Sequence, residues 1–246
     1  MLIYDKYNLN LEKLKSDFKD CSDFLIREII IDGRRAIVAA MDGLINGQQL
    51  NNMIMAPLFS HSVDADNPTE HFDIIKKQIV APLEMNEVNT FEKCEFFMMS
   101  GFAAFILDGY PGALVLGVQG WSRRTTDEPV NEAMVKGAKE CFVETLNDNK
   151  ALLRKRLKTP HLKMKQIKLG KTATTPVVIV YVDDRAPEGT VKEIESRLFG
   201  AELNSAFDYG CLEPFIGSDI PSFFQASEIP SALTCLLQSC LREESA

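Results

Sequence analysis

The sequence predicts an α/β protein with two similar small subdomains, each a mixed β-sheet flanked by helices, joined by a polar linker. Apolar segments with the two-residue period of strands alternate with segments that repeat every 3.6 residues, as amphipathic helices do. The order helix, strand, strand, Asp, helix occurs twice, and adding 141 to a position places Ile37 on Val178 and Asp42 on Asp183. The predicted boundaries are residues 1–120 for the N-terminal subdomain, 121–136 for the linker, 137–225 for the second subdomain and 226–246 for a C-terminal tail.

The first half is expected to begin with a short amphipathic helix over residues 9–20, where Leu11, Leu14 and Phe18 have helical spacing. Two apolar strands follow, FLIREIII and RRAIVAAM. The Asp32-Gly33 pair between them is a strong signal for a tight β-hairpin.

Three further helices are expected in this half, over residues 48–58, 67–80 and 88–99. The second of them has the clearest start. Asn67 is a suitable N-cap, Pro68 suits the first helical position, and Glu70 is placed to complete a capping box.

The most apolar run of the chain extends from Phe96 to Trp121 and resembles a membrane span at first sight. The turn-forming residues DGYPG at 108–112 interrupt it, and the uncharged part before Asp108 is too short to cross about 30 Å of hydrocarbon. Two strands around a turn, GFAAFIL and ALVLGV, explain the run better.

The central segment ends in the longest helical pattern of the sequence, which carries Leu146, Leu153 and Leu157 on one apolar stripe. The same period places Asn149 inside this stripe. A buried amide is costly unless it is hydrogen-bonded, so we expect Asn149 to be buried and to bond backbone groups of the Arg124–Pro129 segment.

The second half is expected to contain the strands LKMKQIKL and TPVVIVYV, then a helix that starts near Pro187. The alternation of apolar residues in the first strand changes phase after Gln166, which suggests a β-bulge there. Asp183 and Asp184 follow the second strand and are interpreted as turn formers and as a cap for the next helix.

The motif RRTTDEP and the segment from NEAMVKGAKECFVE through VVIVYV resemble the A subunit of spore germinant receptors of the GerA type. The resemblance is dense from about Gly120 to Leu198, with lysines, an alanine and a cysteine at four positions where the family has other residues. The matching positions form the candidate site, as family signature and as expected subdomain interface. They are Arg124, Glu128, Pro129, Gly137, Glu140, Phe142, Glu144, Asn149, Arg154 and Arg156, with Tyr181 matching further on.

The resemblance implies a pair of α/β subdomains reminiscent of substrate-binding proteins, and a non-enzymatic role in nutrient sensing and signal transduction during spore germination. It also implies a place on the cytoplasmic side of the spore inner membrane. The implied partners are the B and C subunits and further copies of the receptor. In the family this portion precedes several transmembrane helices, so the chain is either part of a longer protein or a free-standing relative.

Composition is consistent with a globular chain of 246 residues, 46% of them hydrophobic and 25% charged. The formal net charge of −8 argues against nucleic acid as a partner. No signal peptide or transmembrane helix is visible, so the chain itself is expected to be soluble. Six cysteines without metal-type spacing are expected to be reduced thiols.

No motif predicts a cofactor, a metal centre or catalysis. The LGKT sequence that ends at Thr172 lacks the first glycine and the following helix of a phosphate-binding loop, so a hairpin turn is the better interpretation. The loop from His61 to His71 holds several metal-type ligands but has no recognised ligand spacing. No serine lies in a nucleophile-elbow motif.

The segment from Lys150 to Lys171 contains nine lysine and arginine residues and no acid. It is interpreted either as a solvated face paired with acids elsewhere or as a contact for an anionic membrane surface or acidic partner. Lys163 and Lys165 are expected to protrude on one strand face and to make that contact. The alternative to a receptor domain is a stand-alone small-molecule-binding α/β module.

Overall fold

The computed structural model describes residues 1–65, 67–120, 142–143, 145–187, 189–201 and 212–216. The chain divides into two compact units, one formed by Met1–Arg124 with Thr145–Pro160 and the other by Thr125–Glu144 with His161–Ala246. This division places the central helix with the first unit, whereas the sequence boundaries assigned it to the second subdomain. The predicted linker 121–136 and tail 226–246 lie outside the described residues.

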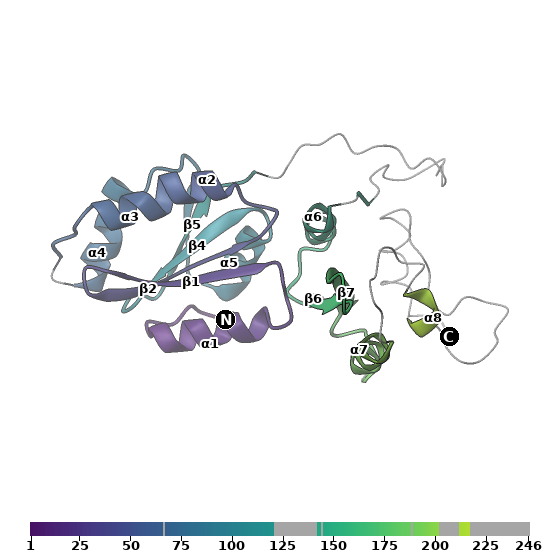
Figure 1. Cartoon of the computed structure of the whole chain (residues 1–246). Helices are drawn as coiled ribbons and strands as arrows, with labels where there is room; N and C mark the ends of the chain where they lie inside the picture. Colours follow the sequence, from purple (N-terminus) through teal and green to yellow (C-terminus); the bar gives the residue numbers. More distant parts are fainter. Residues whose placement is uncertain (66, 121–141, 144, 188, 202–211, 217–246) are drawn as a thin grey trace, which may run out of the picture. The chain divides into compact units, whose positions relative to one another are not determined.

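A five-stranded sheet with the order β1-β2-β4-β5-β3 forms the centre of the first unit (Figure 1). The α/β class predicted from the sequence is confirmed, but the strand pairs described in both units are antiparallel, not mixed. The strands are β1 (Phe24–Ile31), β2 (Arg34–Met41), β3 (Met85–Val88), β4 (Phe102–Leu107) and β5 (Ala113–Gly117). β4 and β5 lie in the apolar run that resembled a membrane span.

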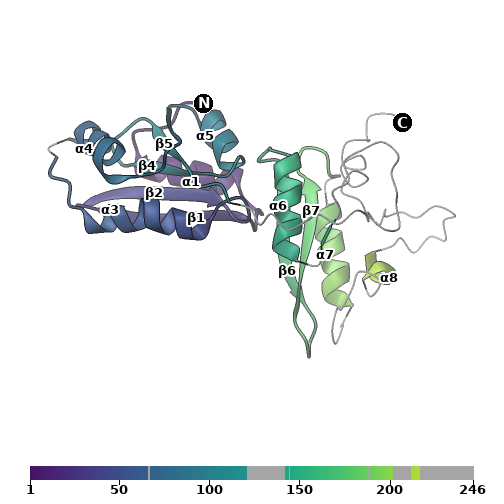
Figure 2. The same cartoon turned by 90° about the horizontal axis from the view of Figure 1, so that it is seen from above.

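Helices cover both faces of this sheet. On β2, Ile37, Ala39 and Met41 belong to one buried cluster, which includes residues of α1 (Tyr7–Asp17) and α5 (Phe91–Met98). The neighbouring residues Ala36, Val38 and Ala40 belong to the other cluster, on the opposite face. That face is covered by two helical segments, namely α2 (Gly47–Leu50), η1 (Asn51–Met55) and α3 (Ala56–Ser60), then α4 (Pro68–Ile74) and η2 (Ile75–Ile79). Figures 1 and 2 show α1 and α3 on opposite sides of the strands.

The local signals read from the sequence are found where they were expected. Asp32 and Gly33 form the two-residue turn between β1 and β2 with positive φ angles of 47° and 79°, as a type I′ turn requires. The Asn67 side chain accepts a hydrogen bond from the Glu70 backbone N–H at 2.8 Å, with Pro68 at the first helical position. These short-range interactions fix the start of α4 and the register of the hairpin.

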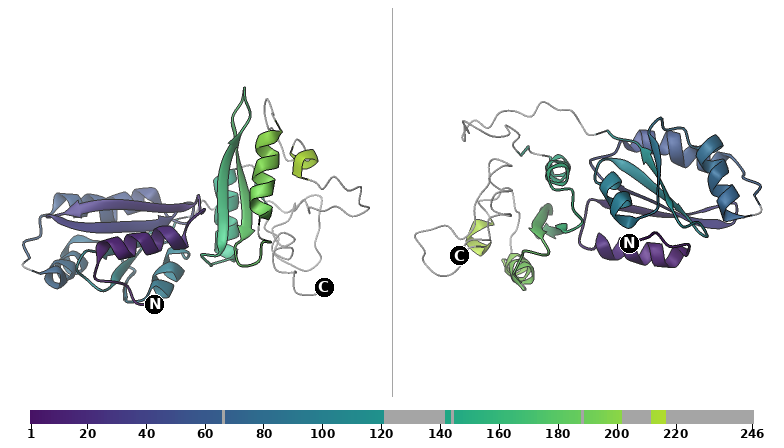
Figure 3. Two further views of the ribbon diagram at one scale, coloured as in Figure 1. Left: turned by 90° about the horizontal axis from the view of Figure 1, so that it is seen from below. Right: turned by 180° about the vertical axis from the view of Figure 1, so that it is seen from behind.

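In the second unit, the described residues form a two-stranded sheet of β6 (Leu162–Leu169) and β7 (Thr175–Val182), followed by α7 (Thr190–Gly200) and the short α8 (Glu213–Ile216). Ile167 and Leu169 share a small buried cluster with Leu198 of α7, and Figures 2 and 3 show α7 alongside the hairpin. The LGKT sequence lies at the turn between β6 and β7, as the hairpin interpretation predicted.

Two local expectations for the second unit are wrong. The pairing of β6 with β7 runs without interruption through Gln166, so there is no β-bulge. The phase change arises because Leu162, Lys163 and Met164 are all buried, so burial does not alternate at the start of the strand. Asp183 and Asp184 form a turn, but they do not cap the next helix, whose N-cap residue is Gly189 with φ of 90°.

Shifting β2 by 141 residues reproduces β7, because 34 plus 141 is 175 and 41 plus 141 is 182. The preceding helices correspond in the same way, since α1 shifted by 141 spans 148–158 and α6 spans Leu146–Arg156. The repeat therefore covers a helix and a hairpin in each half of the chain. None of the described helices is both long and apolar enough to cross a lipid bilayer.

Candidate functional site

The helix α6 carries the densest part of the sequence signature and packs within the first unit. Ala151 lies against the turn that follows β2, where Gly43 has φ of 78°. A Cβ atom at Gly43 would be 2.9 Å from the Ala151 Cβ and 3.3 Å from the Asn147 carbonyl oxygen. The absence of a side chain at Gly43 thus allows the helix to approach the turn closely.

The buried face of α6 differs from the apolar stripe that the periodicity predicted. Lys150, Ala151, Leu153 and Arg154 are buried, whereas Leu146 and Leu157 are only half-buried. Two of the four buried residues are basic. Periodicity assigns charged residues to the solvent side of a helix, so it misplaced this face.

Arg154 is fully buried and forms a two-bonded ion pair with Asp23, which is also buried and immediately precedes β1. Its Nε donates to Asp23 Oδ2 at 2.8 Å and its Nη2 donates to Asp23 Oδ1 at 3.1 Å. Its Nη1 donates to the Thr159 carbonyl oxygen at 2.7 Å. Such a forked arrangement is the strong geometry for an arginine and a carboxylate.

This ion pair connects segments that are far apart in the sequence. The Asp23 carbonyl oxygen also accepts from the Asp42 N–H at 2.7 Å, so Asp23 extends the β1–β2 ladder by one pair. Arg154 therefore fixes α6 to the open end of the first hairpin. Through Thr159 it also holds the chain shortly before His161, the first residue of the second segment of the other unit.

A buried ion pair costs much of its Coulomb attraction in lost hydration, but removal of only one partner leaves a buried charge uncompensated. In this site the hydrogen bonds that Arg154 donates to Asp23 and Thr159, together with the ladder bond of Asp23, offset that loss. The arrangement can hold α6 in one position on the hairpin.

The other signature residues have different surroundings. Phe142 and Asn149 are half-buried and Arg156 is exposed, so the expectation that Asn149 is buried is wrong. Six signature residues lie outside the described residues, namely Arg124, Glu128, Pro129, Gly137, Glu140 and Glu144. The hydrogen bond expected between Asn149 and the Arg124–Pro129 segment therefore also falls outside the described part of the chain. The role of the signature as a subdomain interface stays a prediction.

Asp23 is the residue that the sequence reasoning missed. It stands 131 positions before Arg154, and nothing in its local sequence distinguishes it from the acids of surface turns. The available signal was indirect: an arginine beside Leu153 on a helix that packs on a core needs a partner, and one buried acid elsewhere had to supply it.

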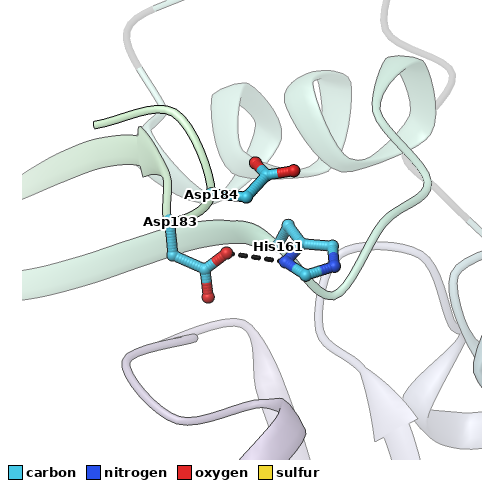
Figure 4. Close-up of side chains that lie close together, drawn as sticks. All are labelled: His161, Asp183 and Asp184. Atoms are coloured by element: carbon cyan, nitrogen blue, oxygen red, sulfur yellow. Dashed lines mark hydrogen bonds and ion pairs between the residues drawn. The ribbon is translucent and has the colours of Figure 1, made fainter. Parts of the chain in front are cut away.

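A second group of polar side chains lies at the start of β6 and the end of β7 in the second unit. Figure 4 shows His161, Asp183 and Asp184, with the His161 Nδ1 2.7 Å from Asp183 Oδ1. Their ligand-type atoms lie within 4.8 Å of one another and all three residues are exposed. Lys163 Nζ lies 3.3 Å from Asp183 Oδ2, so the ammonium group of Lys163 already pairs with this carboxylate. The cluster is an exposed ion-pair network.

The two lysines expected to protrude do not do so. Lys163 is buried beside Asp183, and Lys165 Nζ donates to Glu195 Oε2 of α7 at 2.8 Å. Both are held by acids of their own unit because β6 is covered on the side where they lie. Contact of these two lysines with an anionic surface stays a prediction.

The metal-type residues of the loop from His61 to His71 point to different places. The His61 Nδ1 lies 3.0 Å from the Pro57 carbonyl oxygen, at the surface. His71 is buried, its Nε2 is 3.9 Å from Asp32 Oδ2, and burial lowers the pKa of its imidazole. Among the described residues of this loop no common ligand sphere forms.

Residues 12–230 match the family model described as the Bacillus/Clostridium GerA spore germination protein. Two similar proteins from Bacillus subtilis (strain 168) are the uncharacterized membrane protein YfkQ and spore germination protein B1. The first is 28% identical over 232 residues, which cover 93% of this chain and 45% of the relative. The second is 29% identical over 220 residues, which cover 87% of this chain and 44% of the relative. The chain thus spans about half the length of these relatives.

A solved structure shares the fold. The N-terminal domain of the A subunit of the Bacillus megaterium spore germinant receptor GerK3 aligns with a TM-score of 0.59 and 22% identity, over 80% of this chain and 72% of that chain. The family model matches most of the sequence and includes both α6 and the strands it packs against. The chain therefore belongs to the GerA family of spore germination proteins.

Proposed function

We propose that this chain is the sensing and signal-transducing domain of an A-type subunit of a spore germinant receptor. The role is non-enzymatic and lies on the cytoplasmic side of the spore inner membrane. The observation that carries the proposal is the family match over residues 12–230, which includes the buried Arg154 of the first unit.

The surroundings of Arg154 support a part in signalling. Its three bonds join the start of β1, the helix α6 and the Thr159 carbonyl group, all of them in the first unit. A ligand or partner that favoured another position of Thr159 would have to break a partly buried, charge-assisted hydrogen bond. A device of this kind holds one conformation until a sufficient differential affinity shifts the population.

The proposed partners are the B- and C-type receptor subunits and neighbouring receptors. Relatives named as spore germination proteins support this assignment at the level of the family. A co-purification experiment from spore membranes, with a tagged copy of the chain, tests it. Recovery of the tagged chain without either type of subunit contradicts the proposed assembly.

Deletion of the gene from the spore-forming host tests the function itself. We expect spores without the protein to lose optical density more slowly than wild-type spores after addition of amino acids, sugars or nucleosides. Complementation with the Arg154→Met variant should leave germination slow, because the substitution leaves the Asp23 carboxylate buried without its cation.

The matched control for that experiment is Lys155→Met, which removes an exposed cation next to Arg154 on α6 from a position outside the family signature and should restore germination. Immunoblots must show that each variant is present in the spores. Normal germination of the deletion strain with every nutrient contradicts the proposal. Binding of a nutrient by the purified chain, in that case, would favour the stand-alone small-molecule-binding module.

A further inference from the structure

The two edges of the five-stranded sheet differ in how well they are protected. β3, at one edge, has only four residues, MNEV, and two of them are polar or charged. β1, at the other edge, has eight residues, FLIREIII, with neither proline nor glycine. Long apolar edge strands are templates for further strand pairing, and proteins usually shorten or charge them. In the described part of the chain, β1 pairs with β2 alone.

The backbone of β1 offers hydrogen-bonding groups at this edge. The Asp42 N–H donates to the Asp23 carbonyl oxygen, and Ile31 pairs with Arg34 across the two-residue turn. In an antiparallel ladder the residues alternate between facing the partner strand and facing away from it. Counted from Asp23, the backbone groups of Ile26, Glu28 and Ile30 face away from β2.

A groove of about 600 Å³ lies along this edge. Tyr7 and Leu11 of α1 line it from one face of the sheet, Phe59 of α3 lines it from the other, and the residues from Arg27 to Ile30 of β1 form its floor. Phe59 and Ile30 are exposed, with 55% and 65% of their surface accessible. The groove therefore offers backbone bonds between two apolar walls.

The charges of the groove are matched except at one position. The Arg35 Nη2 is 3.0 Å from Asp108 Oδ2, and Glu28 accepts hydrogen bonds from the Tyr7 hydroxyl at 2.7 Å and from Lys15 at 2.9 Å. The guanidinium of Arg27 lies 6.0 Å from the centre of the Phe59 ring. No carboxylate of the described residues pairs with Arg27, so the groove lacks one negative charge.

We propose that this edge binds an extended peptide segment of a partner protein by strand addition to β1. The backbone of the segment bonds to Ile26, Glu28 and Ile30, and an acidic side chain lies against Arg27. Apolar side chains two positions to either side of that acid contact Leu25 and Phe59. Backbone bonds supply affinity and the alternating side chains supply specificity in such complexes. The inference does not depend on the proposed function.

A second copy of this chain is a poorer occupant because of the charges on β1. If two copies of β1 paired in antiparallel orientation about a two-fold axis perpendicular to the sheet, the residues directly opposite each other would have side chains on the same face of the sheet. The two central registers then set Arg27 against Arg27 or Glu28 against Glu28. Like charges directly opposite each other destabilise a strand pair, so the sequence of β1 disfavours its own symmetric pairing.

The test uses the full chain and the blocked peptide TVTETVT, which places the acid between two valines on one face. The control peptide is TVTKTVT. Fluorescence anisotropy of the labelled peptides should show the acidic peptide binding about tenfold more tightly than the lysine peptide. Arg27→Glu should reverse this preference. Amide exchange at Ile26, Glu28 and Ile30 should slow when TVTETVT is added, with the other β1 amides unchanged.

Ile30→Pro separates strand addition from simple adhesion. It removes one outward N–H and leaves the ladder to β2 intact, the one setting in which an edge strand accepts proline. We expect the variant to keep the wild-type circular dichroism spectrum and to bind neither peptide. If it does not fold, TVTETVT with N-methyl groups along one edge serves instead and should not bind. Unchanged amide exchange, equal binding of both peptides, or a dimer that Ile30→Pro abolishes would each overturn the proposal.

Discussion

The two hairpins related by the 141-residue shift have the same strand pattern but different surroundings. In β2 the six residues from Ala36 to Met41 are all buried. In β7 the residues from Val177 to Val182 are only half-buried. The first hairpin belongs to a five-stranded sheet with helices on both faces, whereas the second is described as a two-stranded sheet with one small cluster. The number of neighbouring strands and layers, more than the pattern of a strand, determines how deeply its side chains are buried.

The largest effect is expected where a charge is buried. Arg154→Met should lower the free energy of unfolding of the first unit by about 3–5 kcal/mol, because the Asp23 carboxylate stays buried without its cation. Urea denaturation measures it. The double variant Asp23→Asn with Arg154→Met should recover most of the loss, since neither charge is then left. A single variant within about 1 kcal/mol of wild type would show that the site is solvated.

The next largest effect compares two positions that the shift superposes. Ile37→Ala should cost about 2–5 kcal/mol, because Ile37 is fully buried between helices and sheet. Val178→Ala should cost about 1 kcal/mol, since Val178 is half-buried and loses less apolar contact. Amide exchange within each unit is the suitable measurement, because the two units need not unfold together. Equal losses at both positions would contradict the difference in burial.

A pH-dependent effect is expected on α5 of the first unit. Burial, together with a hydrogen bond and the charge of Asp17, raises the pKa of Glu95 from 4.5 to about 7. A carboxyl group whose pKa is raised in the folded state favours folding below its unfolded pKa, and this contribution is lost as pH rises through the folded pKa. Wild-type stability should therefore fall between pH 4.5 and about 7 relative to Glu95→Gln. Parallel thermal melting curves of the two proteins across this range would refute the assignment.

The smallest effect concerns the basic residues of the second unit. Binding to anionic vesicles should be weak and sensitive to salt, with up to about 1 kcal/mol for each charge near the surface. The change Lys168→Glu should weaken it more than Lys163→Glu, because Lys168 is exposed whereas Lys163 is buried and paired with Asp183. Co-sedimentation with neutral and anionic vesicles measures this. Equal binding to both kinds of vesicle would eliminate a membrane contact.

The sequence was most informative where an interaction joins residues close to each other in the chain. The Asp32-Gly33 turn and the Asn67 cap each depend on three or four consecutive residues, and both were predicted with their geometry. The split of the Phe96–Trp121 run into two strands likewise followed from the turn within it. The bulge predicted at Gln166 is wrong because alternation was used where the strand is buried on both faces.

The sequence by itself determined the α/β class, the repeat of a helix and a hairpin in each half, and the membership of the GerA family, but it missed the strand β3, where a helix was expected from residue 88. Each of these depends on local propensity, on periodicity or on a pattern of residues in the chain. Only the tertiary structure decided that α6 packs within the first unit, that Arg154 is buried against Asp23, and that β1 is an edge strand of the sheet described here. The physical reason is that burial and charge pairing are set by neighbours across the fold, and the partner of Arg154 lies 131 residues away.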